Sequence, residues 1–473
     1  MKKEKMSPHH RKILLTVMLA SFLTPFNGSA MNMSLPDLQN EFQVATSSLS
    51  WVISLFLMTC AVFLLPAGQL SNSLGKRRLF LWGTALFTLS SILTQFASTF
   101  TMLLVFRTVQ GVASAILFTT SMSIVALAFP PRERGRAFGL VVSVVYAGLA
   151  LGPVIGGFLN YQFGWRSIFW FTAAVGLASW LMTVFVMKEE WVSDPDSRLD
   201  VTGALLCGLS LVLVMLGLSE INRFEPAKWI LLAGVVTTAV FVVNQYGKEK
   251  PLLPVRIFME NRTFTLSNLA AMLNYAATFA VGFLMSLYFQ KVDGMNSQEA
   301  GLFMLVTTVI MTFLSPAMGA LSDRVSPRIL ASSGMALIAV ALFAMIHGIE
   351  TDSRVQIVFC LALLGVGFAL FSAPNNNSVM SSVPKHYVSL ASSVINLVRL
   401  IGQVLSMAVV AYILSRHVPE AVSETHTLTT NIEIALAAFG VICLVGVVPS
   451  YVRGNVRHAH DAPAPVAAQG KED

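Results

Sequence analysis

Charged residues are scarce in this sequence. They make up 12% of the 473 residues, whereas hydrophobic residues make up 55% and the mean hydropathy is +0.70. A soluble protein of this length has about a quarter of its residues charged, because charged side chains cover its surface. Half that share means that most of the surface does not face water. The composition therefore excludes an ordinary soluble protein and predicts an integral membrane protein.

Residues that support catalysis or metal binding are also few. The four cysteines lie inside apolar runs without metal-ligand spacing, which is typical of buried free thiols. The sequence has no Gly-Lys-Ser/Thr phosphate loop and no nucleophile–base arrangement, so we expect neither an enzyme nor an ATP-driven pump, and no cofactor or metal. The net charge of +7 comes from short basic clusters between apolar runs, which indicates membrane orientation and not nucleic-acid binding. The cysteines are Cys60, Cys207, Cys360 and Cys443.

What the sequence does contain is a series of long apolar runs. A bilayer core about 30 Å thick needs about 20 apolar residues in a helix. Fourteen runs of that length predict an all-α membrane protein with fourteen transmembrane helices. The runs are residues 13–33, 50–70, 79–99, 102–128, 137–160, 167–187, 201–219, 229–246, 264–289, 300–321, 328–347, 355–381, 389–414 and 432–452.

The basic residues between these runs predict the orientation. Of the 31 lysines and arginines, 23 fall on the side that carries both ends of the chain, 6 fall on the opposite side, and Arg107 and Arg399 lie within runs. By the positive-inside rule both termini are expected in the cytoplasm. The first run continues into Asn27 and Asn32 without a small-residue cleavage site, so we expect it to be retained as a helix of a multi-pass cell-membrane protein.

A short loop motif occurs twice and divides the chain into halves. Residues 68–77 read GQLSNSLGKR, and residues 319–328, 251 positions further on, read GALSDRVSPR. Many secondary transporters form a midplane binding site between repeated halves. We expect six-helix bundles over residues 1–187 and 263–452, an inserted transmembrane helix pair with cytoplasmic linkers over 188–262, and a disordered cytoplasmic tail over 453–473.

These loops and the number of spans resemble the fourteen-span branch of the drug:proton antiporters in the major facilitator superfamily. Residues 165–170 (WRSIFW) and 200–203 (DVTG) also resemble this branch. The resemblance implies the major-facilitator fold and makes both loops cytoplasmic gates. Their acid is present as Asp323 and replaced by Asn72 in the first loop, which would weaken that gate by about 1 kcal/mol or more. The implied gating residues are Gly68, Asn72, Gly75, Arg77, Gly319, Asp323 and Arg324.

The predicted fifth span contains closely spaced glycines. Residues 148–157 read GLALGPVIGG, where glycines four positions apart let another backbone approach and the proline bends the helix. Ordinary membrane packing is the alternative explanation of such residues. The Gly-Pro followed by Gly-Gly resembles the antiporter motif of the family, which implies export. The motif residues are Gly148, Gly152, Pro153, Gly156 and Gly157.

Two arginines lie inside predicted spans. An arginine in the hydrocarbon region costs about 2.5 kcal/mol or more, so each needs a polar interior. Arg107, together with Gln110 and Gly111, resembles a family motif linked to proton relay. A fixed charge that steadies the bundle is the alternative role. Arg399 lies in residues 396–402, which also resemble the family.

The acid that the family has in its first span is missing. Asn27 occupies its position, whereas Ser29 stands in for a threonine and Asn32, Leu35 and Pro36 match the family. An amide does not exchange protons near neutral pH, and none of the 24 acidic residues falls in the middle of a predicted span. A cavity without acids disfavours cations, because a buried cation needs a counter-charge.

The predicted cavity is therefore cationic and rich in amides. Asn27 and Asn32 are five positions apart and do not share one helix face. The run of asparagines at 375–377 also fits hydrogen bonds between helices that serve stability alone. The residues predicted to bind substrate or take part in coupling are Asn27, Asn32, Arg107, Gln110, Asn274, Tyr275, Asn375, Asn376 and Arg399.

These features predict a secondary-active exporter of small organic molecules that works by alternating access. Proton coupling is implied by the resemblance, but its usual carboxylate is missing. One alternative is an uncoupled facilitator or an exporter of an anionic or lipid-like metabolite, and another is a non-transporting membrane receptor that kept the fold. The expected partners are a small organic substrate, protons and the lipid bilayer, with no nucleic acid, and the protein is expected to be a monomer.

Overall fold

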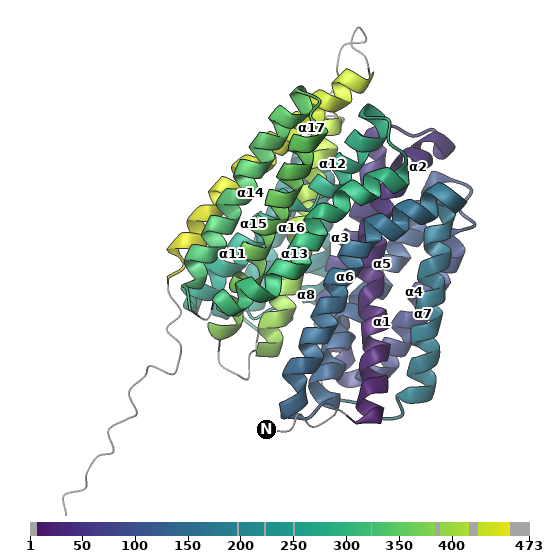
Figure 1. Cartoon of the computed structure of the whole chain (residues 1–473). Coiled ribbons are helices and arrows are strands. Elements are labelled where there is room, and N and C mark those ends of the chain that lie inside the picture. Colours follow the sequence, from purple (N-terminus) through teal and green to yellow (C-terminus); the bar gives the residue numbers. More distant parts are fainter. Residues whose placement is uncertain are drawn as a thin grey trace, which may run out of the picture.

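The structure is a computed structural model that describes residues 7–195, 198–221, 224–248, 251–322, 324–383, 388–415 and 424–454. Every regular element in these ranges is helical (Figure 1). The first half contains α1 (Pro8–Ala30), η1 (Met31–Ser34), α2 (Leu35–Phe42), α3 (Thr46–Leu74), α4 (Lys76–Thr94), α5 (Phe100–Ala128), α6 (Pro131–Phe163) and α7 (Arg166–Val186). Then follow α8 (Val201–Ser219), α9 (Ala227–Tyr246), α10 (Arg256–Glu260), α11 (Arg262–Thr278), α12 (Val281–Leu287), η2 (Tyr288–Val292), α13 (Ser297–Leu321), α14 (Pro327–Glu350), α15 (Arg354–Ser381), α16 (Val388–Leu414) and α17 (Glu424–Val452).

Thirteen helical segments in the described part of the chain are long and apolar enough to cross a membrane. The predicted span missing from this count is α4, which has 19 residues but begins with Lys76, Arg77 and Arg78. These three charges lower its hydropathy, although α4 lies between α5 and α7 in the same bundle. The all-α, multi-pass architecture predicted from the sequence is confirmed.

In each half, the C-terminal part of the first membrane-spanning segment is broken into shorter helical pieces. In the first half, α1 contains Pro25 and passes through the 3₁₀ turn η1 into α2, so that one segment runs from Pro8 to Phe42. In the second half, α11 ends at Thr278, α12 follows, and the π-helix η2 completes the segment at Val292. Interrupted helices expose backbone groups at membrane depth, which is tolerated only where protein surrounds them. All residues of η1, and all of α12 except the half-buried Gly282, are indeed buried.

The helices form two groups that pack mainly within themselves. In the first group α1 packs on α6 and α7, α3 on α5, and α4 on α5 and α7; in the second α14 packs on α15 and α17, and α11 on α16 and α17. We call the end of the molecule where α1 begins the proximal end and the opposite end the distal end. By the orientation predicted from the basic residues, the proximal end is the cytoplasmic one.

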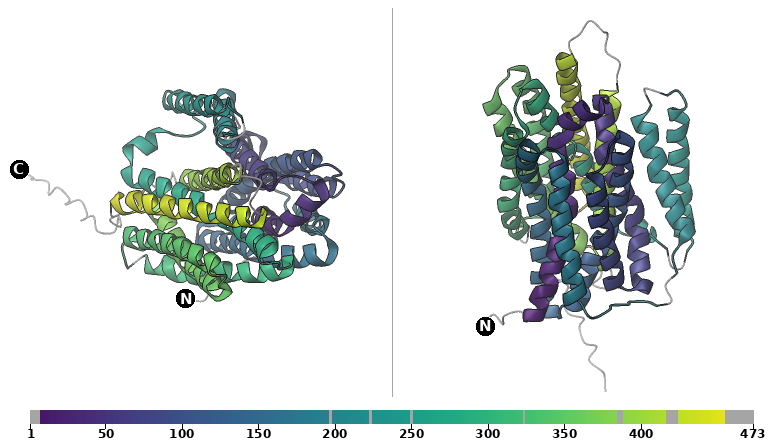
Figure 2. Two further views of the ribbon diagram at one scale, coloured as in Figure 1. Left: turned by 90° about the horizontal axis from the view of Figure 1, so that it is seen from above. Right: turned by 90° about the vertical axis from the view of Figure 1, so that its right-hand side faces the viewer.

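The pair α8 and α9 stands apart from both groups as a hairpin (Figure 2, right-hand view). Its two helices approach closely through glycines, since a Cβ on Gly217 would lie 2.5 Å from the backbone nitrogen of Leu231. On its inner side α8 contacts α3 of the first group and α16 of the second. The hairpin therefore lies along the seam between the two groups.

A polar cluster at the proximal end fixes this hairpin. The Asp200 carboxylate accepts hydrogen bonds from the Gly203 N–H (2.8 Å), from Gln245 Nε2 (2.7 Å) and from Lys248 Nζ (2.5 Å). The Asp200 N–H in turn donates to Gln69 Oε1 of α3 at 2.9 Å. Asp200 is thus an N-cap of α8 and also joins α9 and α3.

Replacing Asp200 with alanine is expected to destabilise the hairpin by about 1 kcal/mol at neutral pH, because the cap and the ion pair are both lost. Burial opposes ionisation of this carboxyl, but the bonds from Gln245, Lys248 and Gly203 outweigh burial and lower its pKa. The stabilisation is therefore complete above the ordinary aspartate pKa and disappears as the pH falls through the lowered value. Thermal unfolding of wild type and variant should differ at pH 7 and converge in acid. The matched control is Glu225→Gln, whose pair with Lys228 is exposed; an equal effect of both variants would contradict this role.

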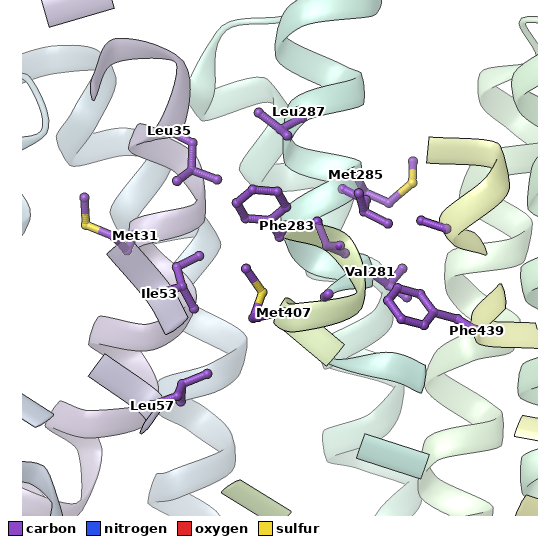
Figure 3. Close-up of a cluster of buried hydrophobic side chains, with 14 of the residues drawn as sticks. Met31, Leu35, Ile53, Leu57, Val281, Phe283, Met285, Leu287, Met407 and Phe439 are labelled. Atoms are coloured by element: carbon purple, nitrogen blue, oxygen red, sulfur yellow. The ribbon is translucent and has the colours of Figure 1, made fainter. Parts of the chain in front are cut away.

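The two groups meet at the distal end. A buried apolar cluster there combines side chains from η1, α2, α3, α12, α16 and α17 (Figure 3). Ser286 Oγ donates to the Asn32 carbonyl, Lys291 Nζ donates to Gln39 Oε1, and Ser297 Oγ donates to the Gly157 carbonyl at 3.1 Å. The apolar cluster and these three hydrogen bonds join the two groups here, so the distal end is closed. The labelled members of the cluster are Met31, Leu35, Ile53, Leu57, Val281, Phe283, Met285, Leu287, Met407 and Phe439.

Candidate functional site

Arg107 lies at the centre of a buried polar cluster in the first group. It sits two turns into α5, which begins at an N-cap formed by Thr99, and it has no solvent exposure. Its Nε donates to the Val52 carbonyl of α3 at 3.0 Å, and its Nη1 donates to Asn27 Oδ1 of α1. The Phe56 ring covers one face of the guanidinium, with Cζ 4.4 Å from the ring centroid. These contacts hold the guanidinium against α1 and α3.

Gln110 extends this cluster to a fourth helix. Its Oε1 accepts a second hydrogen bond from Arg107 Nη1 at 3.0 Å, while its Nε2 donates to Ser91 Oγ of α4 at 2.9 Å. The next residue, Gly111, has no space for a side chain, because a Cβ would lie 2.6 Å from the Phe56 carbonyl oxygen. The motif thus combines a polar network with close packing of α5 on α3.

All acceptors around Arg107 are neutral. They are the amide oxygens of Asn27 and Gln110 and the carbonyl oxygen of Val52. The ion pairs that the described residues form lie elsewhere, at helix ends such as Arg166–Glu41 and Arg354–Asp293. Two buried donors in the cluster, Arg107 Nη2 and Asn27 Nδ2, have no partner. The cluster is therefore a buried cation with amide ligands.

Asn32 and Asn27 contact different helices. Asn32 lies in η1, where its carbonyl oxygen accepts from Ser286 of α12 and its Oδ1 is buried without a partner. Asn27 instead faces Arg107 on α5. The structure thus places one amide in the first-group cluster and the other at the distal contact between the groups.

A second polar set joins the two groups at mid-height. Tyr146 Oη of α6 lies 3.0 Å from Ser372 Oγ of α15, and the Arg399 guanidinium of α16 lies 5.3 Å from the centroid of the Phe118 ring of α5. Tyr275 of α11 lies close to both Ser372 and Arg399. This set includes two predicted residues, Arg399 and Tyr275. Sequence reasoning missed Tyr146, Ser372 and Phe118, because nothing local marks a residue whose partner lies on another helix.

Asn274 is a buried amide of α11. It precedes Tyr275, is fully buried, and neither its Nδ2 nor its Oδ1 has a hydrogen-bond partner. A buried amide without partners costs about 1–3 kcal/mol. Both polar groups of this side chain are therefore buried without compensation in this conformation.

The asparagines of α15 lie in a different environment, toward the proximal end. Asn375 Oδ1 accepts from Arg453 Nη1 at 2.5 Å and its Nδ2 donates to the Ser267 carbonyl at 3.2 Å. Asn377 Nδ2 donates to Ser322 Oγ at 3.0 Å, and Asn376 is half-buried. These contacts favour the alternative of hydrogen bonds between helices.

Arg453 is the residue that sequence reasoning misplaced. The sequence predicts it at the start of a disordered cytoplasmic tail, but it directly follows α17 and is 2% exposed. Arg453 Nη1 donates hydrogen bonds to Asn375 Oδ1 and to Ser267 Oγ (3.3 Å), and Arg453 Nη2 donates to the Pro327 carbonyl at 2.7 Å. Its position at the end of the last apolar run was the only available signal, and that position suits a snorkelling loop residue equally well. Residues 455–473, the rest of the predicted tail, lie outside the described residues.

The first gate loop is bound by the segment after α7. Asn72 Oδ1 accepts from Lys76 Nζ at 2.5 Å, and Gly75 has φ = 98°, a conformation that favours glycine. The Glu190 carboxylate accepts from the backbone N–H groups of Arg77 (2.8 Å) and Arg78 (3.0 Å). Arg77 Nε donates to the Met187 carbonyl. The loop is therefore tied within the first group, and Glu190 is a partner that the motif did not indicate.

The second gate loop is described except for Asp323, which lies outside the described residues. The Arg324 N–H donates to the Leu321 carbonyl at 3.0 Å. A Cβ on Gly319 would lie 3.6 Å from the Ala373 side chain, and one on Gly68 in the first loop would lie 3.7 Å from Thr119. Both distances are ordinary contacts, so neither glycine is required by close packing in this conformation.

The glycines of α6 allow two different close approaches. A Cβ on Gly148 would lie 2.8 Å from the Phe22 carbonyl oxygen, one on Gly152 1.8 Å from Ser29 Oγ, and one on Gly156 2.7 Å from the Ala30 side chain. These three glycines face α1 in the same group. Gly157 and Pro153 instead face α13 of the second group.

The contact between α6 and α13 is made by backbone on both sides. A Cβ on Gly157 would lie 2.3 Å from the Ser297 carbonyl oxygen, and a Cβ on Gly301 would lie 2.3 Å from the Pro153 carbonyl oxygen. Such distances do not occur for real Cβ atoms, so both glycines are needed. The antiporter-type segment is thus also the tightest described contact between the two groups.

Two groups of membrane-spanning helices around buried polar residues define a multi-pass membrane transporter. The chain belongs to the Major Facilitator Superfamily, whose family model matches residues 17–407. It is 27% identical over 373 residues to the riboflavin transporter RibZ of Clostridioides difficile, covering 79% of this chain and 81% of that protein. It is also 28% identical over 414 residues to the multidrug resistance protein Stp of Mycobacterium tuberculosis, covering 86% and 76%.

Solved structures share the fold. A bacterial homologue of the human lysosomal transporter Spinster superposes with a TM-score of 0.69 at 14% identity, covering 95% of this chain and 98% of that one. The D-xylose–proton symporter gives 0.68 at 12% identity, with the same coverage. The major-facilitator fold predicted from the sequence is confirmed, and the relatives are transporters and not enzymes.

Proposed function

We propose that this protein exports small organic molecules by alternating access of the two helix groups, residues 1–187 and 263–452, with residues 188–262 as an inserted pair. The closed distal end and the polar set at mid-height support this mechanism. The proximal end faces the cytoplasm in this proposal, following the distribution of basic residues. In this conformation the transporter is closed toward the outside, which suits binding of a substrate from the cytoplasm.

The substrates we propose are neutral or anionic. The observation that carries this point is the cationic interior, because Arg107 and Arg399 are accompanied by amides and hydroxyls. A cationic drug would need a counter-charge to offset its desolvation, which costs several kcal/mol. Asn274, Tyr275 and Arg399 are the proposed substrate contacts, and Arg107, Asn27 and Gln110 form the proposed coupling cluster.

The branch we propose is that of the fourteen-span drug:proton antiporters, with altered coupling. The name of one relative supports export: the chain is 26% identical over 412 residues to a tetracenomycin C resistance and export protein of Streptomyces glaucescens, covering 86% of this chain and 76% of that protein. The resemblance implies an acid at position 27 of that branch, and in this structure position 27 faces Arg107. Here Asn27 occupies it, so a proton carrier is missing from the cluster.

Asn27→Asp is expected to make transport dependent on a pH gradient. The new carboxylate would face Arg107 Nη1, which stabilises its charged form until substrate or a conformational change displaces it. Inverted vesicles should be prepared from a strain without other efflux pumps and tested with and without an uncoupler. Riboflavin, tetracenomycin C and a panel of neutral, anionic and cationic dyes are suitable substrates.

The wild type should lose at most about twofold of its uptake with the uncoupler, whereas the Asn27→Asp variant should lose most of it, on the order of tenfold. Asn32→Asp is the matched control, because this amide lies at the distal contact and not beside Arg107. Full uncoupler sensitivity of the wild type would contradict the proposed role of Asn27. Uptake of cations in preference to neutral and anionic compounds would contradict the proposed substrate class.

A further inference from the structure

At mid-height the two groups meet through side chains that lie between two closed flanks. The flanks are closed because α6 packs on α13 and α3 packs on α16. Within the described ranges, by contrast, α5 and α6 do not pack on α11 or α15. The link between these inner helices is a pair of hydroxyls, with Tyr146 Oη of α6 lying 3.0 Å from Ser372 Oγ of α15. The side chains at this height therefore face the interior of the transporter and not the lipid.

Several of these side chains keep surface that water can reach. Phe118, Tyr146, Phe368 and Arg399 are each half-buried, whereas Arg107 is 0% exposed. Phe118, Tyr146 and Arg399 each contact the opposite group, so they lie at the face between the groups. A ligand thus has access to Arg399 in this conformation, which it does not have to Arg107.

Arg399 brings a full positive charge to this height without a carboxylate partner. The ion pairs of the described residues lie at helix ends and do not include it. Its Cζ lies 5.3 Å from the centroid of the Phe118 ring, and one cation–π contact does not occupy all five N–H donors of a guanidinium. Tyr275 lies close to it but supplies a hydroxyl and not a charge. An anionic ligand would therefore find a cation that no acid of the described residues neutralises.

Aromatic rings from four helices of both groups accompany this arginine. Phe118 comes from α5 and Tyr146 from α6, while Tyr275 of α11 and Phe368 of α15 pack edge to face with centroids 5.7 Å apart. Phe368 and Ser372 are four residues apart on α15 and share one helix face. Tyr275 in turn lies close to Ser372 and Tyr146, so the rings and the hydroxyls form one connected set. Flat apolar rings with hydroxyls nearby suit an aromatic ligand that also carries polar groups.

We propose that this mid-height set binds planar aromatic compounds that carry one acidic group, a carboxylate or a phenolate. The acidic group pairs with Arg399, the ring system packs on the aromatic side chains, and the hydroxyls bond to further polar atoms of the ligand. A single cation in the set matches a single negative charge. This inference rests on the proposed export function in one respect, that the ligands are also the exported substrates. The set consists of Phe118, Tyr146, Tyr275, Phe368, Ser372 and Arg399.

The test is equilibrium binding of three matched probes to the purified wild type in detergent. Naphthoate has planar rings and a carboxylate, naphthamide has the same rings and a neutral amide, and decalin carboxylate has the charge on a saturated bicycle. Calorimetric titration at neutral pH, with protein-free micelles subtracted, gives each Kd. We expect naphthoate to bind on the order of tenfold more tightly than either of the other probes, because only naphthoate satisfies both parts of the set.

Three variants assign the two parts of this preference to residues. Arg399→Gln should bring the naphthoate and naphthamide Kd values to a ratio of about one, whereas Arg399→Lys keeps the charge and should still prefer naphthoate. Phe118→Leu should reduce the difference between naphthoate and decalin carboxylate, since the ring that it removes contacts aromatic ligands. The matched control is Arg198→Gln, which removes an exposed arginine and should leave all three Kd values unchanged.

Equal affinities of the wild type for naphthoate and naphthamide, or no binding of naphthoate, would overturn the proposal. An anion preference that survives in Arg399→Gln would overturn it too. Should Arg399→Gln fail to fold, the wild-type ratios together with Arg399→Lys and Phe118→Leu decide the point. Uptake of naphthoate into inverted vesicles separates the site from the export function: binding with the expected ratios but without uptake would support the site and contradict export, whereas uptake of other compounds without preferred binding of naphthoate would contradict the site alone.

Discussion

Replacing Gly157 with alanine is expected to open the distal end of the protein. The added Cβ would lie 2.3 Å from the Ser297 carbonyl oxygen of α13. That backbone cannot yield easily, because Asn296 and Glu299 form a capping box that fixes the start of α13. Overpacking costs about 1–3 kcal/mol, which would change the ratio of distal-closed to distal-open molecules by roughly 5- to 150-fold.

Distances between spin labels on Asn40 of α2 and Thr351 after α14 would report this opening. Both positions are exposed, and the four native cysteines are buried, so background labelling should be low. Gly301→Ala should produce the same increase in distance, since its Cβ would lie 2.3 Å from the Pro153 carbonyl oxygen.

Two glycines of the same helix serve as matched controls. Gly139→Ala should be neutral because nothing lies near its Cβ, and Gly156→Ala should lower stability without opening the distal end because its clash is with Ala30 in the same group. Unchanged label distances in both Gly157→Ala and Gly301→Ala would show that the α6–α13 contact does not control closure.

Replacing Arg453 with alanine is expected to produce the largest loss of stability among single side-chain truncations at the proximal end. Its guanidinium joins Ser267 of α11, the Pro327 carbonyl at the start of α14 and Asn375 of α15. Truncation would remove three hydrogen bonds and leave the buried Asn375 Oδ1 without its donor, at a cost of about 2–4 kcal/mol. The apparent Tm in detergent should fall by several degrees.

Two further variants make the Arg453 prediction specific. Arg453→Lys keeps the charge but cannot reach three acceptors on different helices, so it should recover only part of the loss. Arg198→Ala removes an exposed arginine and should have no effect. An Arg453→Ala protein as stable as the Arg198→Ala protein would contradict the role of this residue as a link between helices.

The helices could be predicted from the sequence because each depends on local composition. About 20 apolar residues suffice to define a span, and loop charges such as Lys76 and Arg77 mark its end. Glycine spacing in α6 likewise indicated a close approach. It could not indicate that Gly156 and Gly157, which are adjacent, approach different groups, because this depends on where α1 and α13 lie.

The site was less predictable, because it consists of contacts between helices that are far apart in the chain. An amide in an apolar run indicates that a polar partner exists, but not which one. Asn27 proved to face Arg107, whereas Asn375, assigned to the same cavity, faces Arg453 near the proximal end. Tyr146 and Ser372, 226 positions apart, have no local signal at all, since single tyrosines and serines are common in membrane helices.

The position of the α8–α9 hairpin has a consequence for the route that a lipid-soluble compound can take. Because α8 contacts both α3 and α16, it covers from the bilayer side the seam where these two helices meet. A compound dissolved in the lipid therefore cannot slip sideways into the interior at this seam unless the hairpin moves first. The inserted pair thus covers one flank of the transporter, whereas on the other flank α6 and α13 close the seam by direct backbone contact at Gly157 and Gly301.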